Sequence, residues 1–150
     1  MDAVNLLTTD HEKMRALLKD GQSTRGNDWK GRRRLFLRLR DELLIHERME
    51  EEVLYPALKN HPKAHDIVLE GYEEHHIADL IVEELDETDY TDERWSAKWK
   101  VLKESLEHHM EEEESDMFPK AKKIFDNDDL EALGARMEQI RAESEALARR

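Results

Sequence analysis

Two stretches of this chain repeat each other, and this repeat constrains the fold more than any other feature. The segment HERMEEEVLYP begins at His46, and the segment HMEEEESDMFP begins at His109. In both, a glutamate follows the histidine by four residues, and an aromatic residue and a proline follow at nine and ten. Residues four apart lie on neighbouring turns of one helix face. The repeat therefore predicts two equivalent helices, each carrying one imidazole and one carboxylate.

The duplication also covers the rest of the chain around these segments. Apolar residues precede both segments at the same offset, with Phe36, Leu39 and Leu43 matched by Trp99, Leu102 and Leu106. A second pair of histidines, His11 and His75, is separated by 64 positions, and an acid precedes each. The repeating unit is therefore a pair of helices. Two such pairs bury their apolar stripes most simply as an up-down antiparallel four-helix bundle.

The first helix is expected to begin at a capping box. The side chain of Thr9 can accept a hydrogen bond from a backbone amide of the first turn, while Glu12 reaches back to it. This pattern predicts a helix over 9–19, after a short turn. A polar loop containing two glycines, at 21–27, separates it from a second helix that starts near Asp28.

Prolines mark the ends of the repeated helices. Pro56 and Pro119 occupy the same place in the two copies, and each is expected to end or kink its helix because proline lacks a backbone N–H. Between them, Pro62 suits the first turn of a third helix that reaches about Glu87. A turn at 88–91 then leads into the fourth helix.

The predicted fold class is all-α, an up-down antiparallel four-helix bundle with an additional C-terminal helix. Residues 1–125 are expected to form the bundle, and residues 126–150 a helix that packs on the bundle or extends from it. Apolar residues at helical spacing predict this last helix: Leu130, Leu133, Met137 and Ile140.

Composition excludes several classes of function. A net charge of -13 disfavours binding to nucleic acid or to an anionic membrane, and the basic cluster at 32–34 is interpreted as a solvated helix face. The sequence contains no apolar run of about 18 residues and no signal-peptide pattern. Because cysteine is absent, any metal must be bound by nitrogen and oxygen. We expect a soluble, cytoplasmic protein.

The four helices of the predicted bundle bring a set of potential metal ligands to one level. Four imidazoles and two carboxylates suit iron, manganese or zinc, and two carboxylates placed to bridge favour a pair of metal ions. Iron is the preferred assignment. The predicted ligands are His11, His46, Glu50, His75, His109 and Glu113.

Adjacent residues compete for some of these roles. His76 could replace His75, and His108 could replace His109, although only His109 keeps the register of the repeat. Glu51 and Glu114 are either solvated or hydrogen-bonding partners of the ligand histidines. His61 and His65 lie in or beside a connector and are expected to be solvated.

Two tyrosines could modify the metal centre. Tyr55 and its counterpart Phe118 are expected to close the end of the bundle. A phenol beside a diiron centre could instead hydrogen-bond or coordinate iron, and Tyr72, one turn before His75, has the same option.

These residues resemble the hemerythrin-like, or HHE cation-binding, family, whose pattern of His, His-x-x-x-Glu, His, His-x-x-x-Glu is found over about residues 3–125. The resemblance implies a non-heme diiron centre, with two iron ions linked by two carboxylates and an oxo or hydroxo group. It also implies a small oxidant as ligand: dioxygen, nitric oxide or hydrogen peroxide. Its partners would be such molecules, with no nucleic acid or membrane involved, and a protein partner is not indicated.

One position departs from the family pattern. Oxygen-carrying hemerythrins are similar to this chain but have a further histidine four residues after the third-helix ligand, where this chain has Asp79. Asp79 could be a metal ligand, a hydrogen-bond acceptor near the ligands, or an exposed acid. Fewer imidazoles leave more open coordination, which suits reaction with an oxidant at least as well as reversible carriage.

Three hypotheses follow. The first is a diiron protein that binds or reduces a small oxidant, with possible consumption of peroxide or nitric oxide. The second is an iron- or oxygen-sensing or iron-handling module without significant turnover. The third is a bundle that holds no metal.

Overall fold

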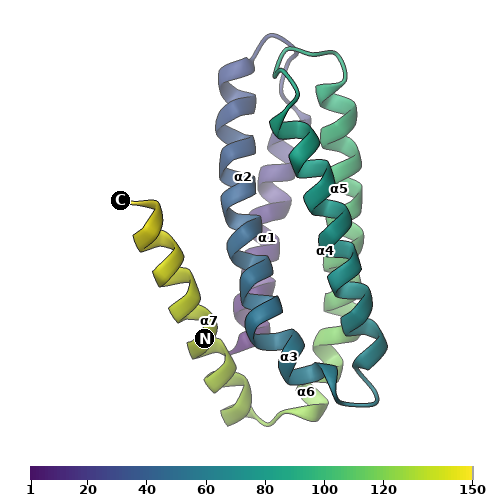
Figure 1. Ribbon diagram of the computed structural model, residues 1–150, viewed down its shortest axis with the longest axis vertical. Helices are drawn as coiled ribbons and strands as arrows, with labels where there is room; N and C mark the ends of the chain where they lie inside the picture. The colour runs from purple at the N-terminus through teal and green to yellow at the C-terminus, as the bar shows by residue number, and fades with distance from the viewer. Residues whose placement is uncertain (150) are drawn as a thin grey trace.

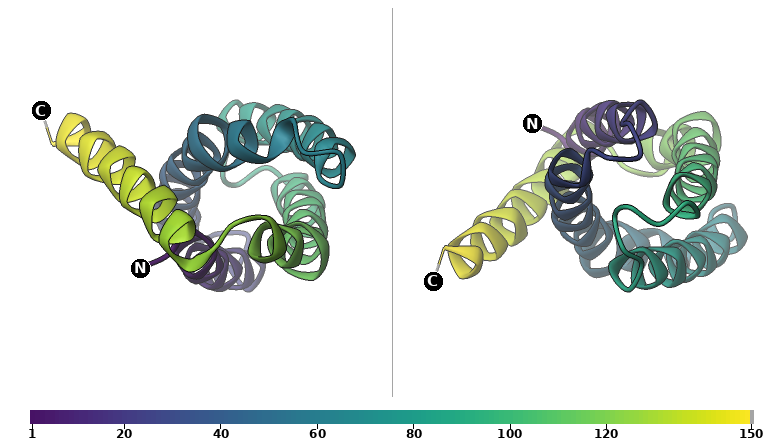
Figure 2. Two further views of the ribbon diagram at one scale, coloured as in Figure 1. Left: turned by 90° about the horizontal axis from the view of Figure 1, so that it is seen from below. Right: turned by 90° about the horizontal axis from the view of Figure 1, so that it is seen from above.

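The computed structural model describes residues 1–149, and every regular element in this range is helical. Four long helices stand side by side as a bundle, which confirms the predicted fold class (Figure 1). Viewed along the bundle, they form a ring (Figure 2). The long helices are α1 (Ala3–Gln22), α2 (Trp29–Met49), α4 (His65–Asp86) and α5 (Trp95–Glu112).

A π-helical turn follows each repeated helix at the same place. The first, η1 (Glu50–Leu54), joins α2 to the short α3 (Tyr55–Lys59). The second, η2 (Glu113–Met117), joins α5 to the short α6 (Phe118–Ile124). The predicted duplication therefore extends to the backbone.

The prolines were expected to end or kink the helices, and the first of these alternatives is wrong. Pro56 and Pro119 lie in the first turns of α3 and α6, and the helical path continues through both. In a π-helix a backbone amide bonds to the fifth carbonyl before it, as Tyr55 N does to Glu50 O. The widened turn lets the chain pass a residue that lacks an N–H, so the helix does not break.

Two predicted helix starts were also misplaced. The N-cap of α1 is Asp2, which accepts a hydrogen bond from Asn5 N at 2.8 Å, whereas Thr9 lies inside the helix and donates to Asn5 O. Pro62 lies in the turn before α4, which begins at His65. Threonine also occurs inside helices, and proline also occurs in the turns that precede them. The local sequence therefore could not show which position each residue takes.

The buried apolar residues form two separate clusters. One is at the end of the bundle where α3, α6 and the start of α7 (Asn127–Ala148) pack, and includes Leu54 and Leu130. The other surrounds Trp95 and Trp99, whose rings stack at 5.0 Å. The candidate ligands occupy the layer between these clusters.

Arg32 corrects the interpretation of the basic cluster as a solvated face. Its side chain is buried, donates to the Tyr90 carbonyl and to Ser96, and lies over the ring of Trp95 at 4.4 Å. Arg33 and Arg34 are exposed, as predicted. Arg32 therefore joins the loop after α4 to the start of α5.

The C-terminal helix α7 packs on α1 and α2, with hydrogen bonds as far along as Ser144, and its far end leads away from the bundle (Figures 1 and 2). Arg150, the last residue of the predicted 126–150 unit, lies outside the described residues. Within residues 1–149, no helix combines the length and apolar character needed to cross a membrane.

Candidate metal centre

The six predicted ligands come together in two groups that share a residue. In the first, His11, His46, Glu50 and Glu113 each place a ligand atom within 4.8 Å of the others. In the second, Glu50 does the same with His75 and His109. All six side chains are buried. We refer to the groups as position A (His11 and His46) and position B (His75 and His109).

Both carboxylates face both positions. Glu113 Oε1 lies 3.1 Å from His11 Nε2 and 3.4 Å from His109 Nε2. Glu50 Oε1 lies 3.0 Å from His75 Nε2 and 3.4 Å from His46 Nε2. Each carboxylate therefore lies between one histidine of position A and one of position B, which is the arrangement that a bridging ligand requires.

The polar atoms at the centre fit a bound cation. His46 Nε2, His109 Nε2 and Glu50 Oε2 are buried without a hydrogen-bond partner. Leaving such atoms unpaired is costly, and native proteins rarely do so. Metal ions placed among them would satisfy all three, and a set of imidazoles and carboxylates suits iron, manganese or zinc.

The electrostatics of the layer also favour a cation. Burial is the largest influence on the pKa of His46 and would lower it, but Glu50 and Asp10 hold this pKa well above its usual range. Burial would raise the pKa of Glu50, but His46 and its neighbours hold it well below its usual range. Without a metal, protons on the histidines supply the positive charge that the carboxylates need.

An acid faces the outer nitrogen of every candidate ligand histidine. His46 Nδ1 lies 3.2 Å from Asp10, His109 Nδ1 lies 3.1 Å from Glu74, and His11 Nδ1 lies 3.2 Å from Glu114. His75 Nδ1 lies at an ion-pair distance of 3.3 Å from Glu51 but makes no hydrogen bond to it. Such partners orient the ring and direct Nε2 towards a metal. This set includes both Glu51 and Glu114.

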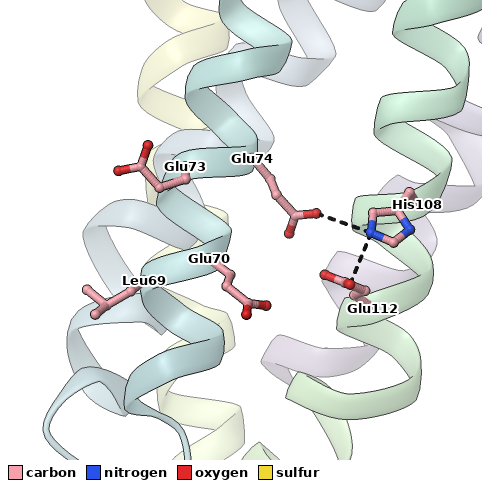
Figure 3. A pocket seen from close by; sticks show the side chains of 6 residues that line it. All are labelled: Leu69, Glu70, Glu73, Glu74, His108 and Glu112. Carbon is pink, nitrogen blue, oxygen red and sulfur yellow. Dashed lines mark ion pairs between the residues drawn. The ribbon is translucent and has the colours of Figure 1, made fainter.

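The two histidines that competed for ligand roles lie outside the layer. His76 is exposed, and so is His108, with 66% of its side chain exposed. His65, which was expected to be solvated, is also exposed. His108 belongs to a surface cluster with Glu74 and Glu112, beside a hollow of about 490 Å³ (Figure 3). His75 and His109, and not their neighbours, are therefore the histidines gathered in the buried layer, in the register of the repeat.

Comparison with known proteins assigns the family. The hemerythrin HHE cation-binding domain matches residues 2–121. The chain belongs to this family. A solved hemerythrin HHE cation-binding-domain protein from Mycobacterium kansasii is similar, with 30% identity and a TM-score of 0.81 over 95% of this chain and 89% of that one. A search of curated proteins finds no significant match.

In this hemerythrin-like centre, the π-helical turn directs Tyr55 inwards. In a regular α-helix Tyr55 would lie about 140° around the axis from Glu50, five residues earlier. The extra residue of the π turn returns it to the inner face. Its hydroxyl donates to Glu113 Oε2 at 2.9 Å and lies 3.4 Å from His75 Nε2. Tyr55 therefore belongs to the apolar cluster at the bundle end and also makes a hydrogen bond within the ligand layer.

Two other aromatic residues near the centre make different contacts from those of Tyr55. Phe118, at the same place in the other repeat, stacks on His11 with ring centroids 5.6 Å apart. Tyr72 contacts the ring of Tyr55 edge-on and has no hydrogen bond to the ligands. Burial, followed by Glu113, raises the pKa of Tyr55 well above its usual value, so the phenol keeps its proton.

Gly71 makes room for this tyrosine. A Cβ at position 71 would lie 2.7 Å from the Tyr55 hydroxyl and 2.8 Å from the ring. Gly71 therefore has a packing role that its weak helix propensity alone does not reveal.

Replacing Gly71 with alanine is expected to lower the free energy of unfolding by about 1–3 kcal/mol through overpacking, although alanine favours helix. The matched control is Gly26→Ala, because no atom lies within 4 Å of a Cβ added there. Urea denaturation of both variants measures the difference. Equal stability of Gly71→Ala and the parent protein would contradict the proposed packing role.

Within residues 1–149, arginines pair with the outer acids of position A but not with those of position B. Arg15 pairs with Glu114, the partner of His11. Arg141 on α7 donates to Asp10 at 2.8 Å, and Asp10 faces His46. Arg141 lies beyond the matched family domain and was not predicted, because nothing distinguishes one arginine of a charged helix from another in sequence.

Asp79 does not lie in either ligand group. It is half-buried and faces Glu47, a buried residue of α2 that was not among the predicted site residues. Burial raises the pKa of Glu47 to about 9, and the nearby Asp79 adds to this rise. Glu47 follows His46 directly in a run of charged residues, so sequence gave no sign that it is buried.

Proposed function

We propose that this hemerythrin-like protein holds two iron ions, at positions A and B, with Glu50 and Glu113 bridging them, and that it binds and reduces a small oxidant. The oxidant is dioxygen, hydrogen peroxide or nitric oxide. The observation that carries the proposal is the pair of ligand groups that share Glu50, with Glu113 Oε1 also 3.4 Å from His109 Nε2. When bound, an iron pair would supply electrons and an open coordination position.

The residues around the centre support reduction over simple carriage. Each position has two imidazoles, and Asp79, at the site of the further histidine in oxygen-carrying relatives, lies outside both ligand groups. The Tyr55 hydroxyl holds a proton inside the ligand layer, 2.9 Å from Glu113 Oε2. The two apolar clusters above and below the layer restrict water. A hydroxyl that keeps its proton here can donate a hydrogen bond to a bound oxidant and stabilise the negative charge that develops on it during reduction.

Metal analysis followed by rapid mixing tests the proposal. Purified protein should contain two iron ions per chain, and its reduced form should react separately with oxygen, nitric oxide or peroxide. His109→Ala should lose metal, whereas His108→Ala, the exposed neighbour, should keep it. Absence of stoichiometric iron, or equal metal content in these two variants, would refute the proposed centre.

Tyr55→Phe is expected to keep both metal ions but to slow oxidant consumption by about 10²-fold, the lower range for loss of one hydrogen-bond donor to a developing anion. The matched control is Tyr72→Phe, since Tyr72 touches the same ring without hydrogen bonding to the ligands. Stopped-flow absorption of both reduced variants measures the effect. Unchanged rates in Tyr55→Phe would exclude this hydroxyl as a hydrogen-bond donor to the oxidant.

A further inference from the structure

The two halves of the centre differ beside their outer acids. His11 in position A and His75 in position B are equivalent in the repeat, and so are the acids that face them, Glu114 and Glu51. The side chains four residues after these two histidines, however, carry opposite charges. Position A has Arg15 there, and position B has Asp79.

A second pair of residues related by the repeat also has an acid in only one of the two halves. Met110 follows His109 and is buried among apolar residues, whereas Glu47 follows His46 and is also buried, at 4% exposure. Packing therefore does not demand a carboxylate at this place. In the repeat, Glu114, Arg15 and Met110 therefore correspond to Glu51, Asp79 and Glu47. The first set contains one acid, and the second set, on the side of His75, contains three.

Within residues 1–149, neither lysine nor arginine pairs with the three acids beside His75, which are Glu47, Glu51 and Asp79. Glu47 Oε1 is buried without a hydrogen-bond partner, and Glu47, Glu51 and His75 place ligand atoms within 4.8 Å of one another. Arg40 shares a surface hollow with Asp79 but pairs with Asp86 at 3.2 Å.

We propose that Glu47, Glu51 and Asp79 bind a divalent cation, in the place that the Arg15 guanidinium takes in the other half of the molecule. Three carboxylates select a hard cation that prefers oxygen ligands, such as Mn²⁺, Mg²⁺ or Ca²⁺. Asp79 lines a surface hollow, so a cation has access to this residue from solvent.

A second cluster of acids on the surface lacks a feature that marks Glu47, a buried carboxylate oxygen without a hydrogen-bond partner. Glu74, His108 and Glu112 also gather potential ligand atoms (Figure 3), but none of these side chains is buried and unpartnered. Glu74 already faces His109, and Glu112 pairs with the exposed His108 at 3.0 Å. This cluster therefore serves as the control.

Manganese titration of the purified protein, with free Mn²⁺ measured by electron paramagnetic resonance, tests the proposed site. The parent protein should bind one Mn²⁺ beyond its tightly held metal. Glu47→Met and Asp79→Arg copy the residues of the other half, and each should weaken this binding at least about tenfold. Glu112→Gln should bind as the parent does. Circular dichroism and tight-metal content of each variant establish that it folds.

The result does not depend on the diiron proposal. If positions A and B held no metal, the parent would still bind one Mn²⁺ more than Asp79→Arg. No additional Mn²⁺ in the parent at millimolar concentration would overturn the proposed site. Retention of it in both Glu47→Met and Asp79→Arg, or its loss in Glu112→Gln, would also overturn the assignment.

Discussion

Replacing Glu113 with alanine is expected to release metal from both positions. Glu113 Oε1 faces His11 Nε2 and His109 Nε2, which belong to different positions, so one substitution removes a ligand from each. Loss of a mere hydrogen-bonding partner of a ligand lowers metal affinity by about 10–100-fold. Loss of a shared ligand should therefore exceed 100-fold at both positions.

Metal analysis after gel filtration measures this effect. Glu111→Ala is the matched control, because Glu111 lies two residues earlier in the same run of glutamates and is exposed. It should keep the full metal content. Glu50→Ala should behave like Glu113→Ala, since Glu50 also faces both positions. Retention of two metal ions by Glu113→Ala would show that this carboxylate does not bridge.

The duplication is the reason that so much of this site could be predicted. A single His-x-x-x-Glu is common in charged helices, but the repeat relates His46 to His109 and His11 to His75 independently of each other. Register, rather than residue type, then distinguishes His109 from His108. The structure brings together all six predicted side chains for the same reason.

The parts that could not be predicted depend on backbone geometry and on distant contacts. The π-helical turns shift Tyr55 to the inner face, and helical periodicity alone places it elsewhere. Arg141 reaches Asp10 from a helix 131 positions away in the chain. The burial of Glu47 depends on how α2 faces α4. Each of these requires the assembled bundle, which a local pattern does not contain.

Removing the metal is expected to make the stability of the protein fall as pH rises. In the metal-free centre, burial would lower the pKa of His75, but Glu50 and Glu51 raise it to about 9. An unfolded histidine titrates near about 6.5. The folded state thus holds this proton more tightly. The resulting stabilisation is complete below about pH 6.5 and is lost as pH rises through 9, which amounts to about 3 kcal/mol at most.

Other groups change stability in the same direction. The pKa values of His46 and His109 also lie well above their usual range, because nearby carboxylates outweigh the effect of burial. Burial raises the pKa of Glu47 to about 9, so ionisation of this group in the folded state is unfavourable at high pH. In the metal-loaded protein the histidines are neutral ligands, so their part of this loss should not occur.

Thermal unfolding of chelated and metal-loaded protein at pH 6.5 and 9 measures both effects. The chelated protein should melt at a lower temperature at pH 9 than at pH 6.5, and His75→Gln should reduce this difference while His76→Ala should not. Because a cation that binds only the folded state stabilises it, the loaded protein should be the more stable at both pH values. A chelated protein as stable as the loaded one would favour a bundle without a metal-dependent role, and would contradict the assignment of these buried histidines and carboxylates to metal binding.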